Sequence, residues 1–448
     1  MTRAMASWYP YLEGRFPSRM AAHALQPAHI GVEHAGASHL LPPLAALQLA
    51  QIFETSSAQQ ASYSSPSGCG LTFYVYPHAN LTNLFSSAQF ADCLPESAAC
   101  STDGMSETSK TTNQSLTLLQ YTAEVLIWNR ILQRCHLTAD PESADGFLVP
   151  FWLGSGIVSG WDGRRPDTIG AAMQAATTTA LATHLSPATA SKHIFLCTVD
   201  VEFVPADNLT RHSVWVNLGD DDRTWLPNDH SPNVMQLERS VTVPFRISPW
   251  LRSADAATRG EGGAGRRRDI LLWSNVNVHR HPGRVRMNDL LLDEADGLGR
   301  TDVRIEKQQV LAVAELTELA TRSTYCLCPT GDSKGFATRF WLALAHGCVP
   351  VYVDLYERPG LNLSTLQLPF RHAIDWERAA VAWPMSKGLV AHLVGRPPPD
   401  REYLSRVRDM VLYRNAPGDA ADVAIESIAK ALGIAAAEEA IPRPRAAD

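Results

Sequence analysis

Short apolar runs alternate with helical stripes over most of the chain. Apolar runs that are bounded by polar residues or proline predict strands at residues 73–76, 147–149, 192–200, 269–273, 325–328 and 348–353. Between them, apolar residues recur about every 3.6 positions at 116–131 and again at 338–345, which predicts helices. Strands that alternate with helices are typical of an α/β protein.

The densest of these patterns is a strand, a loop, a helix and a second strand between residues 323 and 353. Pro329 should end the first strand because proline has no amide hydrogen to donate to a sheet, and Gly347 should end the helix as a left-handed cap. The first amides of such a helix lack partners and lie at the positive end of its dipole, so the preceding loop predicts a diphosphate site. The residues expected to bind the diphosphate are Gly331, Asp332, Ser333, Lys334, Thr338 and Arg339.

This segment resembles the signature of the exostosin-like glycosyltransferases, family 47. In that signature Ser-x-Phe-Cys-Leu-x-Pro-x-Gly-Asp-Ser leads through a helix into Gly-Cys-(Ile or Val)-Pro-Val. The matching residues are Ser323, Cys326, Leu327, Pro329, Gly331, Asp332, Ser333, Arg339 and the run 347–351, with Tyr325 in place of the phenylalanine. An ordinary βαβ unit with a tight turn would explain the glycine and the proline but not the whole ordered string.

Other segments extend the resemblance over roughly residues 71 to 415. Asp140 is expected to cap a short helix that begins at Pro141, which is a structural role. Glu124 lies where the family has a glutamate on the preceding helix, and it is either a substrate-binding residue or part of a solvated helix face. Residues 368–370 and 374–376 resemble the Leu-Pro-Phe and Ile-Asp-Trp pair of the family.

The resemblance implies an α/β fold of the GT-B type, with two Rossmann-like domains that face a central cleft. The linker between them is placed in a Gly- and Arg-rich run that has no apolar periodicity. The expected division is a poorly ordered segment at 1–65, an acceptor-side domain at 66–255, the linker at 256–268, a nucleotide-sugar-binding domain at 269–417 and an Ala-rich helix and tail at 418–448.

The resemblance also implies an inverting transfer, in which an acceptor hydroxyl loses its proton to a carboxylate as it attacks the anomeric carbon of the donor sugar. Asp200 is the first candidate for this base because it follows a strand and would face the cleft, and Glu202 and His193 come after it. Lys192 and Val199 replace an aspartate and a second histidine of the family in this stretch. The alternative for Asp200 is a strand-end aspartate that caps a turn.

Cationic side chains and helix amides usually stabilise the leaving nucleoside diphosphate in this fold, without a bound metal. Arg339 and Lys334 are the candidates in the signature, and an exposed helix residue is the alternative for Arg339. Arg280, followed by Arg284 and Arg286, either reaches phosphate or belongs to a solvated basic turn. We expect no metal and no prosthetic group, and the nucleotide-sugar is a substrate.

One departure from the family concerns the signature helix. Three positions after the arginine, the family usually has an acidic residue that binds a donor hydroxyl, and here that position is Leu342. A leucine cannot accept this hydrogen bond. Either Asp332 binds the donor hydroxyl instead, or the affinity for the donor is weak, or the protein is a non-catalytic glycan-binding or partner protein. A third functional hypothesis is a cytosolic nucleotide-binding enzyme with a similar sheet.

Composition agrees with a large globular protein and excludes one class of partner. The chain has 448 residues, 45% hydrophobic and 19% charged, which is ample material for two domains. A formal charge of -7 and a pI near 6.1 argue against nucleic acid as the main partner. The Asp run 220–222 lacks His or Cys at ligand spacing and is interpreted as a solvated loop. The expected partners are a nucleotide-sugar and a glycan acceptor, and a homodimer or a glycosyltransferase complex is left open.

The compartment is indicated by two features of the sequence. Asn-x-Ser/Thr acceptors begin at Asn80, Asn113, Asn208 and Asn362, and Cys69, Cys93 and Cys100 cluster where a disulfide could staple a loop. Both favour the secretory pathway, and the family predicts the Golgi lumen or membrane. Residues 1–60 show no leader or anchor pattern, so an incomplete amino terminus, another route and a soluble protein are all open. Cysteines 326, 328 and 348 are expected to be small core residues.

Overall fold

The structure is a computed structural model of the 448-residue chain. It describes residues 68–76, 123–149, 181–198, 209–219, 239–247, 268–276, 282–306, 311, 313–330, 338–355, 362–364, 366–414 and 416–434. All of these lie in one compact unit, residues 68–448. The predicted amino-terminal segment (1–65) and all but the last residue of the predicted linker (256–268) lie outside the described residues.

The first half of the described chain builds a parallel sheet of six strands in the order β2-β1-β3-β4-β5-β6. Its strands are β1 (Thr72–Val75), β2 (His136–Thr138), β3 (Gly146–Val149), β4 (His193–Leu196), β5 (Val214–Asn217) and β6 (Arg239–Thr242). The connections include α8 (Ala123–Arg134) and the short helices η6 (Pro141–Ser143), η7 (Ala190–Lys192) and η9 (Thr210–His212). The central strands β3, β4 and β5 are buried throughout, which explains their unbroken apolar runs.

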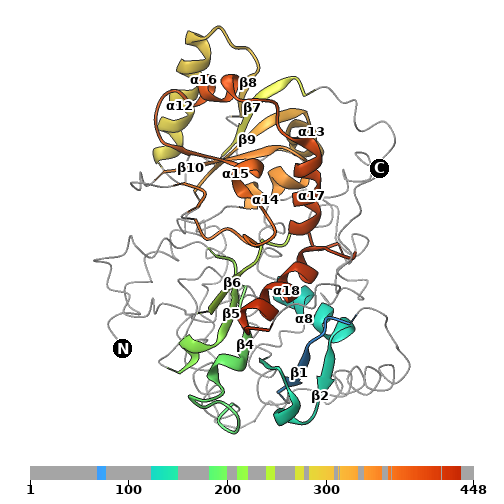
Figure 1. The fold of residues 1–448 in the computed structure, drawn as a ribbon. Coiled ribbons are helices and arrows are strands. Elements are labelled where there is room, and N and C mark those ends of the chain that lie inside the picture. Colours follow the sequence, from blue (N-terminus) through green and yellow to red (C-terminus); the bar gives the residue numbers. More distant parts are fainter. Residues whose placement is uncertain are drawn as a thin grey trace, which may run out of the picture. The chain divides into compact units, whose positions relative to one another are not determined.

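The second half builds a parallel sheet of five strands in the order β11-β10-β9-β7-β8 (Figure 1). Its strands are β7 (Ile270–Asn275), β8 (Val303–Glu306), β9 (Ser323–Pro329), β10 (Val349–Asp354) and β11 (Val381–Pro384). The helices are α12 (Pro282–Gly297), α13 (Val313–Arg322), α14 (Thr338–Ala345), α15 (Trp376–Ala379), α16 (Leu389–Gly395) and α17 (Arg401–Val411). The predicted α/β class with two Rossmann-like sheets is therefore confirmed.

Each sheet has one point at which the chain reverses the direction of strand addition. In the first sheet β2 is added on one side of β1 and β3 on the other, and in the second sheet β8 and β9 flank β7 in the same way. Loops that leave the carboxyl ends of the strands diverge at such a point and leave a crevice for a ligand. The topology thus marks the loops after β1 and β3, and those after β7 and β9.

The unit β9–α14–β10 forms as the sequence predicts. β9 ends at Pro329, α14 covers Thr338–Ala345, and Gly347 follows with φ 64°, a left-handed conformation that favours glycine. The amide of Gly347 donates to Leu344 and that of Cys348 donates to Ala343, which closes the helix end before β10 begins. Phe340, Trp341 and Leu344 bury the inner face of the helix.

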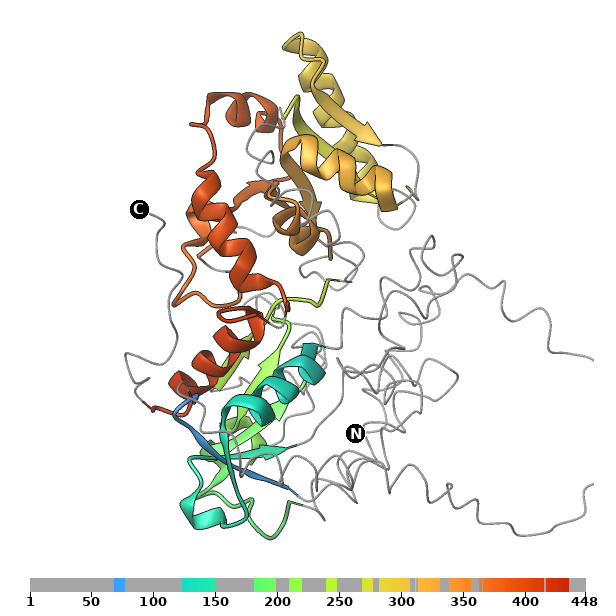
Figure 2. The ribbon, with the colours of Figure 1, turned by 90° about the vertical axis from the view of Figure 1, so that its right-hand side faces the viewer.

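The last described helix, α18 (Ala420–Ala431), packs against α8 and β6 of the first sheet, and both views show it beside α8 (Figures 1 and 2). Asp419 caps it by accepting from the amides of Ala421 and Asp422. Its far end is fastened by Arg239, whose guanidinium donates to the carbonyl of Ala431 over 3.1 Å. The predicted Ala-rich helix is present, and its partners belong to the first sheet.

Candidate functional site

The candidate donor site lies at the carboxyl edge of the second sheet, between β7 and β9. The predicted diphosphate loop begins two residues after Pro329, the last residue of β9, and the segment with Arg280 follows β7. These are the two loops that flank the reversal of strand order. Gly331, Asp332, Ser333, Lys334 and Arg280 themselves lie outside the described residues, so their assignment stays a prediction. The residues that directly precede and follow these loops in the chain lie within the described part of the structure.

Thr330 fixes the entry of the predicted diphosphate loop. Its side chain is fully buried, its amide donates to the carbonyl of Val353 over 2.9 Å, and its hydroxyl accepts from the amide of Leu355 over 3.1 Å. Its carbonyl accepts from the guanidinium of Arg284 over 3.3 Å. The loop therefore leaves a point that is tied to β10 on one side and to α12 on the other.

The exit of the loop is α14, whose first two residues are Thr338 and Arg339. The Nε of Arg339 donates to the carbonyl of Asn275, the last residue of β7, over 2.7 Å. This bond connects α14 to β7 at the point where the strand order reverses, and the residue is half-buried. The positive charge also acts on the Cys328 thiol, whose pKa it lowers against the larger, opposite effect of burial. A cation held at this place, beside the first turn of a helix, suits a negatively charged ligand.

Leu342 lies below Arg339 on the inner side of α14. Its side chain is 7% exposed and lines a cavity of about 30 Å³ with Trp273, Cys328 and Arg339. The volume is enough for a single water molecule. The indole Nε1 of Trp273 is buried there without a hydrogen-bond partner among the described residues, and burial raises the pKa of the Cys328 thiol to about 12. Leu342 therefore contributes apolar surface to a small cavity that Arg339 and Asn275 also line, and it offers no hydrogen-bond acceptor there.

The segment with Arg284 and Arg286 lies in the first two turns of α12, a helix of 16 residues, so the alternative of a solvated basic turn is wrong for these two arginines. Their contact with phosphate stays a prediction. Arg284 is 4% exposed and supports Thr330, whereas Arg286 is exposed. Arg284 thus holds the backbone at the entry of the predicted diphosphate loop.

The first sheet carries the candidate base on the chain that leaves β4. Asp200 lies outside the described residues, and the last described residue before it is Thr198. Glu124, at the start of α8, is fully buried, and its Oε2 accepts from the amide of Thr198 over 3.1 Å and from its hydroxyl over 3.2 Å. The alternative of a solvated helix face for Glu124 is wrong. Its predicted contact with substrate stays a prediction.

His193 lies at the opposite, amino-terminal end of β4 and is fully buried. Its Nδ1 lies 2.9 Å from the carbonyl of Thr189, which can only accept, so Nδ1 carries the proton and Nε2 accepts from the hydroxyl of Tyr76 over 2.6 Å. Burial lowers the pKa of His193 to about 4, and the ring stacks on Phe147 with centroids 4.7 Å apart. This placement does not favour His193 as the base.

The described residues contain two disulfides. Cysteines 326, 328 and 348 are small core residues, as predicted, but the pairing of Cys326 of β9 with Cys348, directly before β10, was not predicted. Cys328 is a buried free thiol. The signal for this disulfide is the parallel pairing of β9 with β10, which places Cys326 opposite Pro350 and therefore close to residue 348. Cys69 pairs with Cys135 at the end of α8. Cys93 and Cys100 lie outside the described residues.

Two searches of the described residues bear on cofactors and membranes. No group of three or more His, Cys, Asp or Glu side chains in them could hold a metal ion, and the run 220–222 lies outside them. None of their helices is long and apolar enough to cross a bilayer.

A protein-family model matches part of the chain. The family model described as the Exostosin GT47 domain matches residues 207–392, which is about two fifths of the chain. The matched range contains Arg280, the predicted diphosphate loop and Arg339. Glu124 and Asp200 precede it. No curated protein matched the chain.

Proposed function

Residues 207–392 are an Exostosin GT47 domain, and from this we propose that the protein is an inverting glycosyltransferase that moves a sugar from a nucleotide-sugar to a hydroxyl of a glycan or polysaccharide. GT47 is a GT-B family, and the two parallel sheets are of the kind that this fold class has. The family supports glycosyltransferase activity in general. The inverting course, the donor and the acceptor are parts of the proposal.

One observation carries the proposal. Arg339 is held across the reversal point of the second sheet by its 2.7 Å bond to Asn275, next to the amino-terminal turn of α14. A loop whose sequence follows the family signature connects β9 to this turn. Helix amides and a fixed cation are the groups that stabilise the charge of a departing diphosphate without a metal. Gly331, Ser333 and Lys334 would complete the binding site.

The proposed reaction is a single displacement. The oxygen of an acceptor hydroxyl forms a bond to the anomeric carbon while the bond from that carbon to the phosphate oxygen breaks. The nucleoside diphosphate leaves with the electron pair, and the hydroxyl proton passes to the carboxylate of Asp200. Arg339 offsets the negative charge that grows on the leaving group.

Release of nucleoside diphosphate is the direct test. The purified full chain would be incubated with a panel of uridine and guanosine diphosphate sugars, hexoses and pentoses, with and without oligosaccharide acceptors. We expect release that depends on both one donor and one acceptor. If no donor in the panel is turned over while a nucleoside diphosphate binds, the proposal of catalysis fails.

The proposed base has its own test, Asp200→Asn. The carboxamide keeps the size of the side chain but cannot take up a proton at neutral pH, so transfer should collapse while nucleoside diphosphate still binds. Loss of both transfer and nucleoside diphosphate binding would assign Asp200 a structural role. Retention of both would place the base elsewhere, and Glu202 would be the next residue to exchange.

The position of Leu342 favours a second candidate function. Position 342 is a leucine whose side chain lines a small cavity beside Arg339, so it provides no carboxylate for a donor hydroxyl. The alternative is a non-catalytic protein that binds glycan or supports an active glycosyltransferase. Binding of oligosaccharides without turnover of any donor would favour it. Light scattering with and without a co-expressed glycosyltransferase would test the homodimer and the complex.

We propose that the protein works in the lumen of the Golgi apparatus. Two disulfides are typical of an oxidising compartment, and the sequon residue Asn362 is exposed. Asn80, Asn113 and Asn208 lie outside the described residues. Endoglycosidase treatment of the native protein should increase its mobility, and Asn362→Gln should remove part of the shift. A protein without any shift that fractionates with the cytosol would contradict the proposal.

A further inference from the structure

The amino terminus of α8 meets the chain that leaves β4, and the two segments bind each other reciprocally. The carboxylate of Glu124 accepts from the amide of Thr198 over 3.1 Å and from its hydroxyl over 3.2 Å. In return, the hydroxyl of Thr198 accepts from the amide of Glu124 over 3.3 Å. Both side chains are fully buried. The contact therefore joins positions that lie 74 residues apart in the chain.

This pattern has the chemistry of a helix capping box, with its two halves supplied by different segments. In a capping box a hydroxyl accepts from an amide of the first helical turn while a Glu side chain accepts from the backbone amide of the hydroxyl residue. Here Thr198 supplies the hydroxyl and the backbone amide, and Glu124 supplies the helical amide and the carboxylate. A carboxylate near a helix amino terminus is also favoured by the helix dipole.

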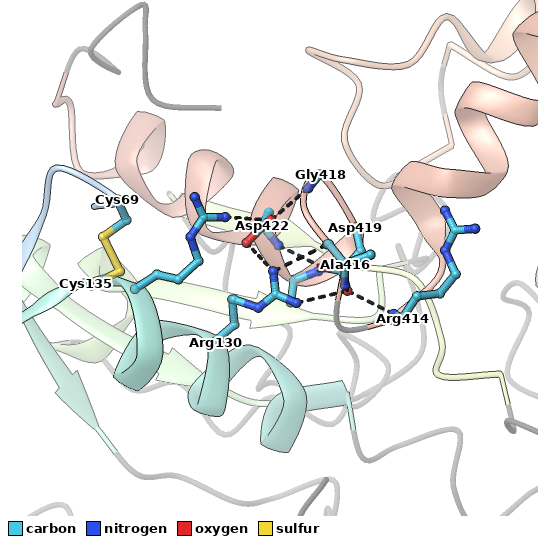
Figure 3. Close-up of polar contacts among 10 residues, drawn as sticks. Cys69, Arg130, Cys135, Arg414, Ala416, Gly418, Asp419 and Asp422 are labelled. Carbon is cyan, nitrogen blue, oxygen red and sulfur yellow. Dashed lines mark hydrogen bonds and ion pairs between the residues drawn. A yellow bond between two sulfur atoms is a disulfide. The ribbon is translucent and has the colours of Figure 1, made fainter. Parts of the chain in front are cut away.

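The helix that carries Glu124 is fixed along its whole length. Arg130 in its middle donates to Asp422 over 2.7 Å, and Arg134 near its end pairs with the same carboxylate over 2.7 Å. Cys135, just beyond the helix, is bonded to Cys69 (Figure 3). Thr198 is thus tied to an element that cannot shift alone.

The position of Thr198 in the chain gives this anchorage a consequence for chemistry. Asp200 follows only two residues later, so its Cα lies at most about 7 Å from that of Thr198. The general base of a displacement must stay within about 3 Å of the proton that it abstracts. Where the chain leaves Thr198 therefore limits where the carboxylate can be.

We propose that Glu124 is a positioning residue for proton transfer: by holding Thr198 it sets the point from which the chain carries Asp200 towards the acceptor hydroxyl. This inference rests on the proposed function. It departs from the expectation that Glu124 binds substrate, because the buried carboxylate holds the backbone of the segment that follows β4.

Four variants test this role: Glu124→Ala, Glu124→Gln, Thr198→Val and Thr198→Ser. We expect Glu124→Ala to lower kcat of transfer about 10- to 100-fold, the loss that misplacement of a catalytic group by about 1 Å causes. KM for the nucleotide-sugar should stay within about twofold, because the donor site lies on the other sheet. Thr198→Ser keeps the hydroxyl and should retain kcat.

The two residues act as a unit in this scheme, so their effects should not add. Thr198→Val combined with Glu124→Ala should lower kcat no further than Glu124→Ala alone. If Glu124→Ala does not fold, Glu124→Gln and Thr198→Val carry the test, because both preserve side-chain volume. The matched control is Asp145→Ala, which removes a carboxylate that accepts from the amide of Thr72 over 2.7 Å, at the amino edge of the same sheet. This control should retain kcat.

The outcomes separate the inference from the proposed function. An active wild type with unchanged kcat in folded Glu124 variants overturns the inference alone. A raised KM for donor or acceptor with unchanged kcat also overturns it, in favour of direct substrate contact. An equal loss of kcat in Asp145→Ala shows a merely structural role. A wild type without transfer on the whole donor panel overturns the proposed function, and the inference with it.

Discussion

At the scale of single residues, Arg339 is the described side chain with the most direct role in the proposed chemistry. Arg339→Ala should lower the rate of transfer about 10- to 1000-fold, because it removes a fixed cation beside the charge that develops on the diphosphate. The fold should survive, since the residue is only half-buried and its hydrogen bond to the carbonyl of Asn275 is worth about 1 kcal/mol. Steady-state kinetics with the active donor measures the effect.

Arg322→Ala is the matched control for this substitution. Arg322 is an arginine of the same domain with a side chain 35% exposed, paired with Asp269 and Glu318, and lies at the amino edge of the sheet, where β9 begins. Its removal should leave transfer unchanged. A well-folded Arg339→Ala protein with wild-type turnover would exclude Arg339 from the site.

His193 makes stability depend on pH. Its pKa is about 4 in the folded protein and 6.5 in the unfolded chain, so between these values the unfolded state binds a proton that the folded state does not. Its contribution is therefore fully present above about pH 6.5 and falls as the pH is lowered, by about 1.4 kcal/mol per unit down to about pH 4.

The variant His193→Asn isolates this effect from other titrating groups. It keeps a donor for the carbonyl of Thr189 but does not titrate. Urea unfolding should show that the stability advantage of the wild type over the variant is about 2 kcal/mol smaller at about pH 5 than at about pH 7.5. An advantage that is constant over this range would contradict a buried neutral imidazole.

Single residues with a local role were predictable from the sequence. Asp140 caps the turn at Pro141 by accepting from Glu142, and Gly347 takes the left-handed conformation, because neighbours in the chain decide both. The partner of Glu124 was not predictable in this way. Thr198 is brought to it only by the packing of α8 on the sheet, and a helix-start glutamate has the same local pattern whether it is solvated or buried.

At the scale of elements, the disulfide Cys326–Cys348 joins the two strands that flank α14. It closes a loop of 22 residues, for which loop-closure entropy predicts about 3 kcal/mol of stabilisation. The double variant Cys326→Ala with Cys348→Ala should lose about this amount in chemical unfolding. The wild type with a reductant should approach the same value.

Cys328→Ala controls for the loss of a buried sulfur. Cys328 lies two residues from Cys326 on the same strand and is a free thiol, so this variant should remain as sensitive to reductant as the wild type. If the wild type showed no response to reductant under conditions that break the bond, the disulfide would not stabilise the fold.

The elements that were predicted are those whose pattern is complete within the segment. β1, β3, β4, β7, β9 and β10 are mostly apolar runs, and α14 shows a clear stripe. α12 was missed because the side chains that it buries include Arg284 and Asn288, so its inner face does not look apolar in the sequence. Through Arg284, this polar inner face holds the start of the loop after β9. The two segments come together only in the folded protein.

At the scale of the whole molecule, α18 is bound to α8 by a buried network of charges. Arg130 donates to Asp422 and Asp419, and Asp422 also accepts from the amide of Gly418 over 2.8 Å (Figure 3). Both carboxylates are 2% exposed and Arg130 is 7% exposed. Water therefore cannot replace either partner without opening the helix pair.

Asp422→Asn should lower the free energy of unfolding by about 3 kcal/mol, because it removes the charge that pairs with Arg134 and one of the two carboxylates that pair with the buried Arg130. Arg378→Ala, which removes one partner of an exposed ion pair with Asp400, should have a much smaller effect. Chemical unfolding of both variants checks this. Equal effects would mean that the network around Asp422 is effectively solvated.

The bond between α8 and α18 also sets an order for biosynthesis. Arg130 emerges from the ribosome long before Asp419 and Asp422, because it is translated 289 residues ahead of Asp419. The first sheet, which ends with β6 at Thr242, is also made before these carboxylates. Until α18 has been made, the side of α8 that it will cover stays open. The half of the molecule that is synthesised first is therefore completed last, and a nascent chain should depend on chaperones up to that moment.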